Sequence, residues 1–132
     1  MKLRLNCDSP DQIRESLFSE DAMNQLTLYH RGLHKDHPAA KWQIVDDKHL
    51  CLVDTGEEIS DVRLKCSTPG KVLMFTFEGI AGHPRETFRF YFADLMLYFL
   101  NFETEQINSM GIYADNSVQW DDEWGGSPAV RT

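Results

Sequence analysis

VRLKCSTPGKVLMFTFE, residues 62–78, is the stretch of sequence that decides the fold. Apolar residues alternate with Arg63 and Lys65 in its first part, a period of two that is typical of a strand with one buried face. The second part repeats the alternation and places Phe75 and Phe77 on one side. A Ser-Thr-Pro-Gly turn joins the two parts, so the stretch predicts a pair of antiparallel strands.

Further strands are predicted on both sides of this pair, because the same alternation or a turn signal recurs. In one of them, Phe88, Phe90 and Phe92 form a stripe that matches the aromatic side of residues 72–78. A final hairpin is expected to turn at residues 115–117. The additional predicted strands are residues 3–7, 42–45, 49–53, 88–92, 110–114 and 118–120.

Helical signals come first near the N-terminus. Ser9 and Pro10 suit the N-cap and the first position of a helix. Ser19 restarts a second helix, for which Gly32 is the expected stop. Residues 25–30 also alternate at period two, so a strand there is the competing prediction.

A later segment, residues 93–102, is apolar on every side. It predicts a helix capped by Asp94 and packed inside the fold. A buried strand or a homodimer surface is the alternative for this segment. The order of elements implies an α+β fold, with a mostly antiparallel sheet and with the N-terminal helices and this later apolar helix packed on one face.

Length and composition predict one globular domain over residues 1–124 and a flexible tail over residues 125–132. The first residues lack the apolar run of a signal peptide, and no segment approaches the roughly 18 apolar residues of a membrane span. We therefore expect a cytoplasmic protein that does not interact with membranes. Three widely spaced cysteines predict reduced, buried thiols, with no disulfide framework or zinc ribbon. They are Cys7, Cys51 and Cys66.

Charge is distributed unevenly along the chain. Residues 1–89 hold 14 acids and 12 bases, whereas residues 90–132 hold seven acids and only Arg131, so −2 and −6 make up the net charge of −8. A surface of one sign attracts basic partners over roughly 8 Å in physiological salt. The same charge argues against nucleic acid, whose binding requires lysine and arginine. A basic protein is therefore the expected partner.

The acidic and aromatic segment near the C-terminus is the predicted binding site. Trp120 and Trp124 are four residues apart, which places both indoles on one side of either a helix or a strand. Tryptophan is favoured at binding hot spots, and its face attracts lysine and arginine. The alternative is that one indole packs onto the edge of the domain while the acids are solvated. The predicted partner-binding residues are Asp115, Trp120, Asp121, Asp122, Glu123 and Trp124.

These features favour a binding protein that neutralises a basic partner. In size and charge the chain is similar to immunity proteins of bacterial nuclease-type toxins, a likeness of composition that carries over no residues. The carboxylates would occupy the partner's sites for phosphates and speed association. No catalytic residue, cofactor or metal is predicted for this function.

The competing hypothesis is a small metal-binding or enzymatic domain. His30, His34 and His37 follow an H-x3-H-x2-H spacing, and the first two share one face if the second helix continues that far. Asp36, or Cys51 brought near by folding, would complete the site. A helix that ends earlier would separate the pair, and two neighbouring basic side chains would oppose a cation. A homo-oligomeric adaptor is the third hypothesis.

Overall fold

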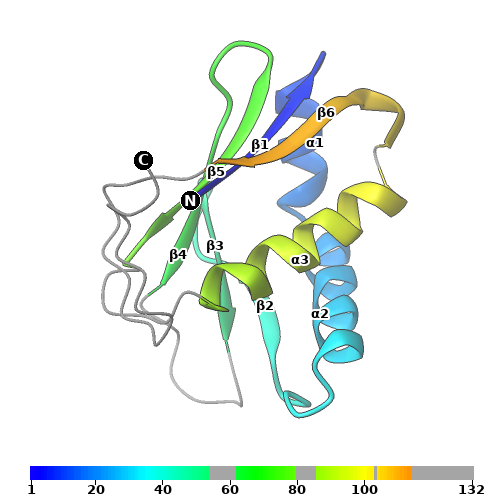
Figure 1. Ribbon diagram of the computed structural model, residues 1–132, viewed down its shortest axis with the longest axis vertical. Helices are drawn as coiled ribbons and strands as arrows, with labels where there is room; N and C mark the ends of the chain where they lie inside the picture. The colour runs from blue at the N-terminus through cyan, green and yellow to red at the C-terminus, as the bar shows by residue number, and fades with distance from the viewer. Residues whose placement is uncertain (54–61, 80–85, 103, 114–132) are drawn as a thin grey trace.

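The computed structural model describes residues 1–53, 62–79, 86–102 and 104–113, and every structural statement below concerns these residues. Six strands form one sheet in the order β2-β3-β4-β5-β1-β6, and each neighbouring pair is antiparallel (Figure 1). The strands are β1 (Lys2–Cys7), β2 (Lys41–Ile44), β3 (His49–Val53), β4 (Arg63–Ser67), β5 (Val72–Glu78) and β6 (Ile107–Tyr113).

One face of the sheet carries the core. The register places Leu3 and Cys66 on either side of Phe75, and all three side chains are buried. In the neighbouring pair, Leu50 lies opposite Leu64. Alternation therefore produces one continuous apolar face, and the strands that it predicts within the first 78 residues are confirmed.

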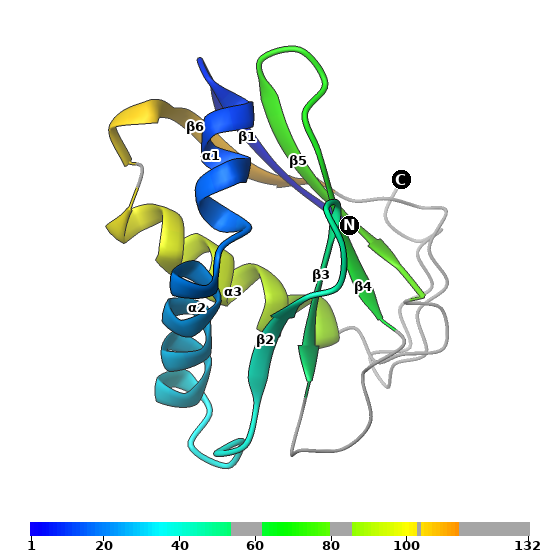
Figure 2. The same cartoon turned by 180° about the vertical axis from the view of Figure 1, so that it is seen from behind.

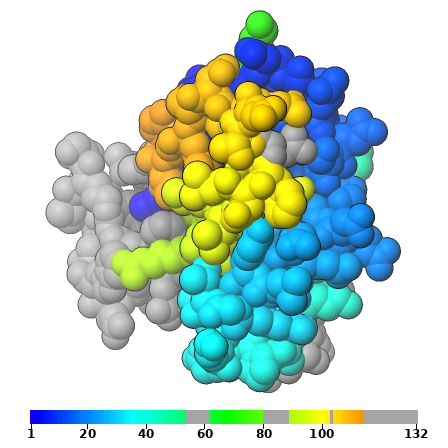
Figure 3. All heavy atoms as spheres, turned by 90° about the vertical axis from the view of Figure 1, so that its right-hand side faces the viewer, coloured from blue at the N-terminus to red at the C-terminus, as the bar shows by residue number. Residues whose placement is uncertain are grey.

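Three helices cover that face (Figure 2). Their buried side chains belong to the same hydrophobic cluster as the sheet residues. Helices α2 and α3 lie side by side on the outer surface of the helical layer (Figure 3). The predicted α+β fold with helices on one face of a mostly antiparallel sheet is thus confirmed. The helices are α1 (Pro10–Leu17), α2 (Glu20–Leu33) and α3 (Glu86–Asn101), and a 3-10 turn, η1 (Thr104–Gln106), precedes β6.

The two N-terminal helices begin where the sequence predicts. Ser9 is the N-cap residue of α1, although its side chain makes no capping hydrogen bond. Ser19 caps α2, because its hydroxyl accepts a 3.2 Å hydrogen bond from the Ala22 N–H. Helix α2 continues to Leu33, one residue beyond the expected stop at Gly32. The competing strand within this helix is wrong.

The predicted strand at residues 88–92 is also wrong, because this segment forms the first part of α3. Five alternating residues do not distinguish a strand from a helix. The buried residues of α3 distinguish the two, because they recur at the spacing of one helical face. They are Tyr91, Phe92, Leu95 and Phe99. Burial in the core, and not cross-strand pairing, therefore decides the conformation of this segment.

A helix in residues 93–102 is confirmed, since α3 continues to Asn101 and packs on one face of the sheet. It is not enclosed on every side, because Leu100 is 59% exposed. The predicted cap is wrong. Asp94 lies in the interior of the helix and its side chain has no exposed surface. A charged residue in such a place requires hydrogen-bond partners, and these define a site described below.

Strand β6 forms one edge of the sheet and pairs with β1, with Leu5 opposite Met110. The predicted strand at residues 110–114 is thus the second half of a longer strand that begins at Ile107. Its predicted partner, residues 118–120, lies outside the described residues. Among the described residues, none of the helices has both the length and the apolar character needed to cross a bilayer.

Candidate functional sites

Three histidines meet at the C-terminal end of α2. His30 lies in the last turn of the helix, and His34 is the C-cap residue, whose N–H donates a 2.8 Å hydrogen bond to the His30 carbonyl. Because the helical path continues to the cap, the two imidazoles remain one turn apart, with ring centroids separated by 4.7 Å. The predicted common face of this pair is confirmed.

The loop after α2 brings the third imidazole back to the pair. The His37 N–H donates a 2.9 Å hydrogen bond to the His34 carbonyl, so the chain reverses immediately after the helix. The His37 ring then stacks 5.3 Å from the His30 ring and 5.4 Å from the His34 ring. The Arg31 side chain donates to the Ala40 carbonyl at 2.9 Å and fixes the far end of the loop. All three predicted histidines are therefore brought together.

Phe90, in α3, closes one side of this cluster. Its ring meets all three imidazoles edge-on, with centroid separations of 5.8, 4.6 and 5.4 Å from His30, His34 and His37. Edge-to-face contact is a favourable arrangement for aromatic rings. Phe90 therefore forms one wall of the histidine cluster.

A buried carboxylate holds the innermost histidine. Asp94 Oδ2 lies 2.9 Å from His30 Nδ1 and accepts a 2.8 Å hydrogen bond from Trp42 Nε1. All three residues are at most 1% exposed. This role differs from the helix cap that the sequence predicts for Asp94. The signal that would have revealed it is a lone acid in an apolar helix, which needs buried donors such as an indole and an imidazole.

The hydrogen bonds determine which nitrogen of each ring carries the proton. With Asp94 as the acceptor, His30 donates from Nδ1, and a neutral ring in that tautomer has its lone pair on Nε2. His30 Nε2 lies 3.1 Å from His37 Nδ1, so His37 donates from Nδ1. The lone pair of His37 is thus on Nε2, which lies 3.7 Å from an Asp36 carboxylate oxygen.

The electrostatics of the cluster favour neutral imidazole at His34. Burial lowers the pKa of His34 below its usual 6.5, and the neighbouring His30 lowers it further. Neutral imidazole is the form that binds metal ions. Ligand atoms of His34, Asp36 and His37 all lie within 4.8 Å of one another, so these residues could hold a metal ion. Cys51 is not a member of this group.

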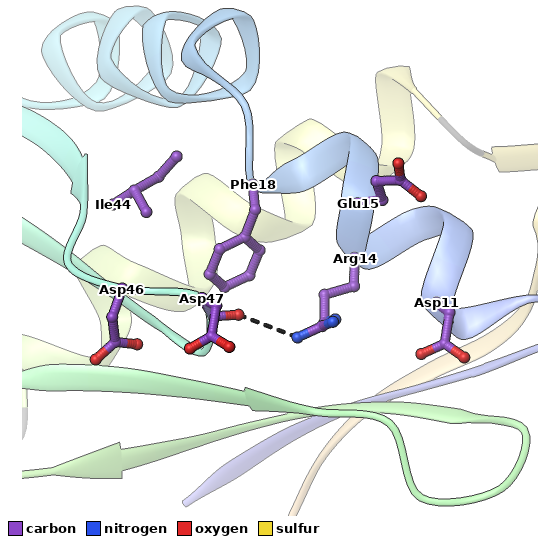
Figure 4. A pocket seen from close by; sticks show the side chains of 7 residues that line it. All are labelled: Asp11, Arg14, Glu15, Phe18, Ile44, Asp46 and Asp47. Carbon is purple, nitrogen blue, oxygen red and sulfur yellow. Dashed lines mark hydrogen bonds between the residues drawn. The ribbon is translucent and has the colours of Figure 1, made fainter.

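A second candidate site is a groove of about 410 Å³ between α1 and the turn that joins β2 to β3 (Figure 4). Phe18 and the 41% exposed Ile44 form its apolar part. The guanidinium of Arg14 lies between the two acidic sides of the groove and donates a 3.0 Å hydrogen bond to the Asp47 carbonyl. Four carboxylates line the groove, those of Asp11, Glu15, Asp46 and Asp47.

One of these carboxylates is held in its ionised form. The Lys48 N–H and then the His49 side chain lower the pKa of Asp46 below its usual 3.8. His49 Nδ1 lies 2.8 Å from Asp46 Oδ1, and its Nε2 lies 2.6 Å from Glu78 Oε1. The hydrogen bond to Asp46, and to a lesser extent that to Glu78, raises the pKa of His49. His49 therefore links the wall of the groove to β5.

The three cysteines are not part of either site. All three are buried and free, as predicted. Burial raises the pKa of each thiol, to about 12 for Cys66. A buried thiol with a raised pKa is a poor nucleophile.

The predicted partner-binding residues near the C-terminus all lie outside the described residues, so the structure does not show whether they come together. They are Asp115, Trp120, Asp121, Asp122, Glu123 and Trp124. The groove itself was not predicted from the sequence. Comparison with protein-family models, curated proteins and solved structures found no significant match to this chain.

Proposed function

We propose that the protein is an acidic binding protein that neutralises a basic protein partner. The groove beside α1 is the observation that carries this proposal. Its four carboxylates and one guanidinium have a formal charge of −3, and they surround exposed apolar surface. Such a combination suits a cationic side chain with an apolar stem.

A lysine or arginine of the partner would enter the groove with its charge among the carboxylates. Its methylene groups would contact Phe18 and Ile44, the apolar residues of the groove. Arg14 supports this mode, because its guanidinium already occupies the groove as an internal cation. A cationic side chain of the partner would lie among the same carboxylates as the Arg14 guanidinium.

The partner that fits best is a nuclease domain, whose cleft is basic because it binds phosphates. Inhibition would be steric and electrostatic, as in the immunity proteins of bacterial toxin systems. The acidic segment around Asp121, Asp122 and Glu123 would extend the contact beyond the groove and raise the association rate. The net charge of −8 supports the same steering.

Two double variants with the same change in charge test the role of the groove. Asp11→Asn/Glu15→Gln removes two groove carboxylates from α1, whereas Glu20→Gln/Asp21→Asn removes two acids from the first turn of α2, outside the groove. Both variants have a net charge two units less negative. Association with a fluorescent peptide that alternates arginine and leucine is measured by stopped flow at low and high salt.

We expect the groove variant to associate about fivefold more slowly at low salt and to show a weaker dependence on salt. The α2 variant should retain most of the parent rate, because its acids face elsewhere. Inhibition itself is tested by adding the protein to a small basic ribonuclease, with the two variants in parallel. Equal rates and equal inhibition in the two variants would contradict a role for the groove.

A further inference from the structure

We propose that His34, Asp36 and His37 bind one divalent transition-metal ion of the zinc class. Ligand atoms of these three residues lie within 4.8 Å of one another at the end of α2. Two imidazoles and one carboxylate are a ligand set that zinc and its neighbours in the first transition row prefer. This site is independent of the groove and of any protein partner.

The hydrogen-bond chain behind the site prepares His37 as a ligand. Trp42 and His30 both donate to Asp94, and His37 donates from Nδ1 to His30 Nε2. This arrangement leaves the Nε2 lone pair of His37 directed toward the space that it shares with Asp36. Metal-binding histidines in proteins are commonly held in this way, with the second ring nitrogen donating to a fixed acceptor.

His30 is therefore a positioning residue and not a ligand. Both of its nitrogens are engaged, one by Asp94 at 2.9 Å and the other by His37 at 3.1 Å. Its side chain is buried, whereas the side chain of His37 is 18% exposed. The metal ion would lie on the outer side of the cluster, where solvent provides an entry path.

The distances allow the site to close around an ion. A tetrahedral ion with bonds of about 2.0 Å holds its ligand atoms about 3.3 Å apart, so shifts of roughly 1 Å suffice. The Asp36 side chain is 83% exposed and free to make such a shift. Three protein ligands leave a fourth coordination position open to solvent, as in metal sites that bind a further ligand.

Two basic residues neighbour the site in the sequence, Arg31 and Lys35, and the structure turns the first of them away from it. Arg31, the basic residue that follows His30, is directed to the Ala40 carbonyl by its 2.9 Å hydrogen bond. Asp36 supplies one negative charge to the ion directly. Asp94 stands behind the chain of histidines and orients the ring of His30.

The test uses the full chain, freed of metal with a chelator, and titration calorimetry with Zn²⁺. One ion per chain is expected. His34→Gln and His37→Gln should each weaken binding about a hundredfold, and His49→Gln, which replaces a histidine at the other site, should bind as the parent does. Circular dichroism checks that each variant is folded. If a histidine variant does not fold, Asp36→Asn replaces it in the titration, because this variant changes an exposed side chain.

A second measurement distinguishes ligands from positioning residues. In metal-free protein labelled with ¹⁵N-histidine, NMR should show protons on Nδ1 of both His30 and His37, and Zn²⁺ should shift Nε2 of His37. Asp94→Asn should weaken Zn²⁺ binding about tenfold or more and change the His30 tautomer. Absence of Zn²⁺ binding by the folded parent, or equal binding by the parent and the His34 and His37 variants, would overturn the proposal.

Discussion

The indole nitrogen of Trp42 donates a 2.8 Å hydrogen bond to Oδ2 of Asp94, and both side chains are buried although 52 positions separate them in the chain. This bond joins the edge strand β2 to the helix α3. The same oxygen is shared with His30 of α2. One carboxylate thus connects three elements of the fold.

Asp94→Ala is expected to lower the free energy of unfolding by about 3–5 kcal/mol, because it leaves the Trp42 and His30 donors buried without an acceptor. Urea unfolding followed by circular dichroism measures the change. Asp36→Ala is the matched control, since it removes an exposed aspartate that also lies beside a histidine. That control should change stability by no more than about 0.5 kcal/mol. Equal losses in the two variants would contradict the role given to Asp94.

The thiols are expected to resist alkylation in the native state. Burial raises the pKa of Cys7 and Cys51, and raises the pKa of Cys66 to about 12, so thiolate is scarce near neutral pH. Iodoacetamide labelling read by mass spectrometry should modify all three cysteines after denaturation and none at short times before it. Rapid modification of Cys66 in folded protein would show that its surroundings open.

The pair of hydrogen bonds at His49 predicts a pH-dependent contribution to stability. Its pKa is raised above 6.5, chiefly by Asp46, so the folded state binds the proton more tightly than the unfolded chain. The stabilisation is fully present below about pH 6.5 and is lost as the pH rises through the folded value. The deficit in stability of His49→Gln should therefore be larger at about pH 5.5 than at about pH 8.

Urea unfolding of parent and variant at both pH values measures this difference. Asp46 remains ionised at the lower pH because its own pKa is lowered. A His34→Gln variant is an informative comparison, since burial lowers the pKa of His34 and predicts the opposite trend with pH. A deficit that does not change with pH would argue against a charged His49 between the two carboxylates.

Neutralising the acidic C-terminal segment is expected to slow association with a basic partner. The variant is Asp121→Asn/Asp122→Asn/Glu123→Gln, and the rate with the arginine-leucine peptide should fall by about an order of magnitude at low salt. High salt should reduce the difference, because it screens the field in the parent. An unchanged rate in a folded variant would restrict the binding surface to the groove.

Local periodicity predicted most of the sheet. The first strand of the stretch 62–78 buries every second residue, and the second strand begins in the same way, so period two is visible in the sequence itself. The strand predicted at residues 88–92 was wrong because its alternation is short. Tyr91 and Phe92 are both buried once the helix packs on the sheet. Tertiary packing, and not local preference, therefore determines that this segment is helical.

The histidine site was predicted in part. The spacing of His30, His34 and His37 is visible in the sequence, but their convergence depends on a helix that runs one residue further than Gly32 indicates. A lone acid in an apolar segment indicates that Asp94 needs buried donors, but local patterns do not identify His30 and Trp42 as those donors. The bond to His30 depends on a contact between α2 and α3, which only long-range packing creates.

The position of β1 in the sheet affects how the chain folds during its synthesis. This first strand lies between β5 and β6, so its neighbours are residues 72–78 and 107–113. During translation, Leu3 and Leu5 are synthesised before β5 and β6, so β1 has no neighbouring strand until much later. Chaperones that hold nascent chains are therefore expected to engage these two leucines, and the sheet closes only when synthesis has passed β6.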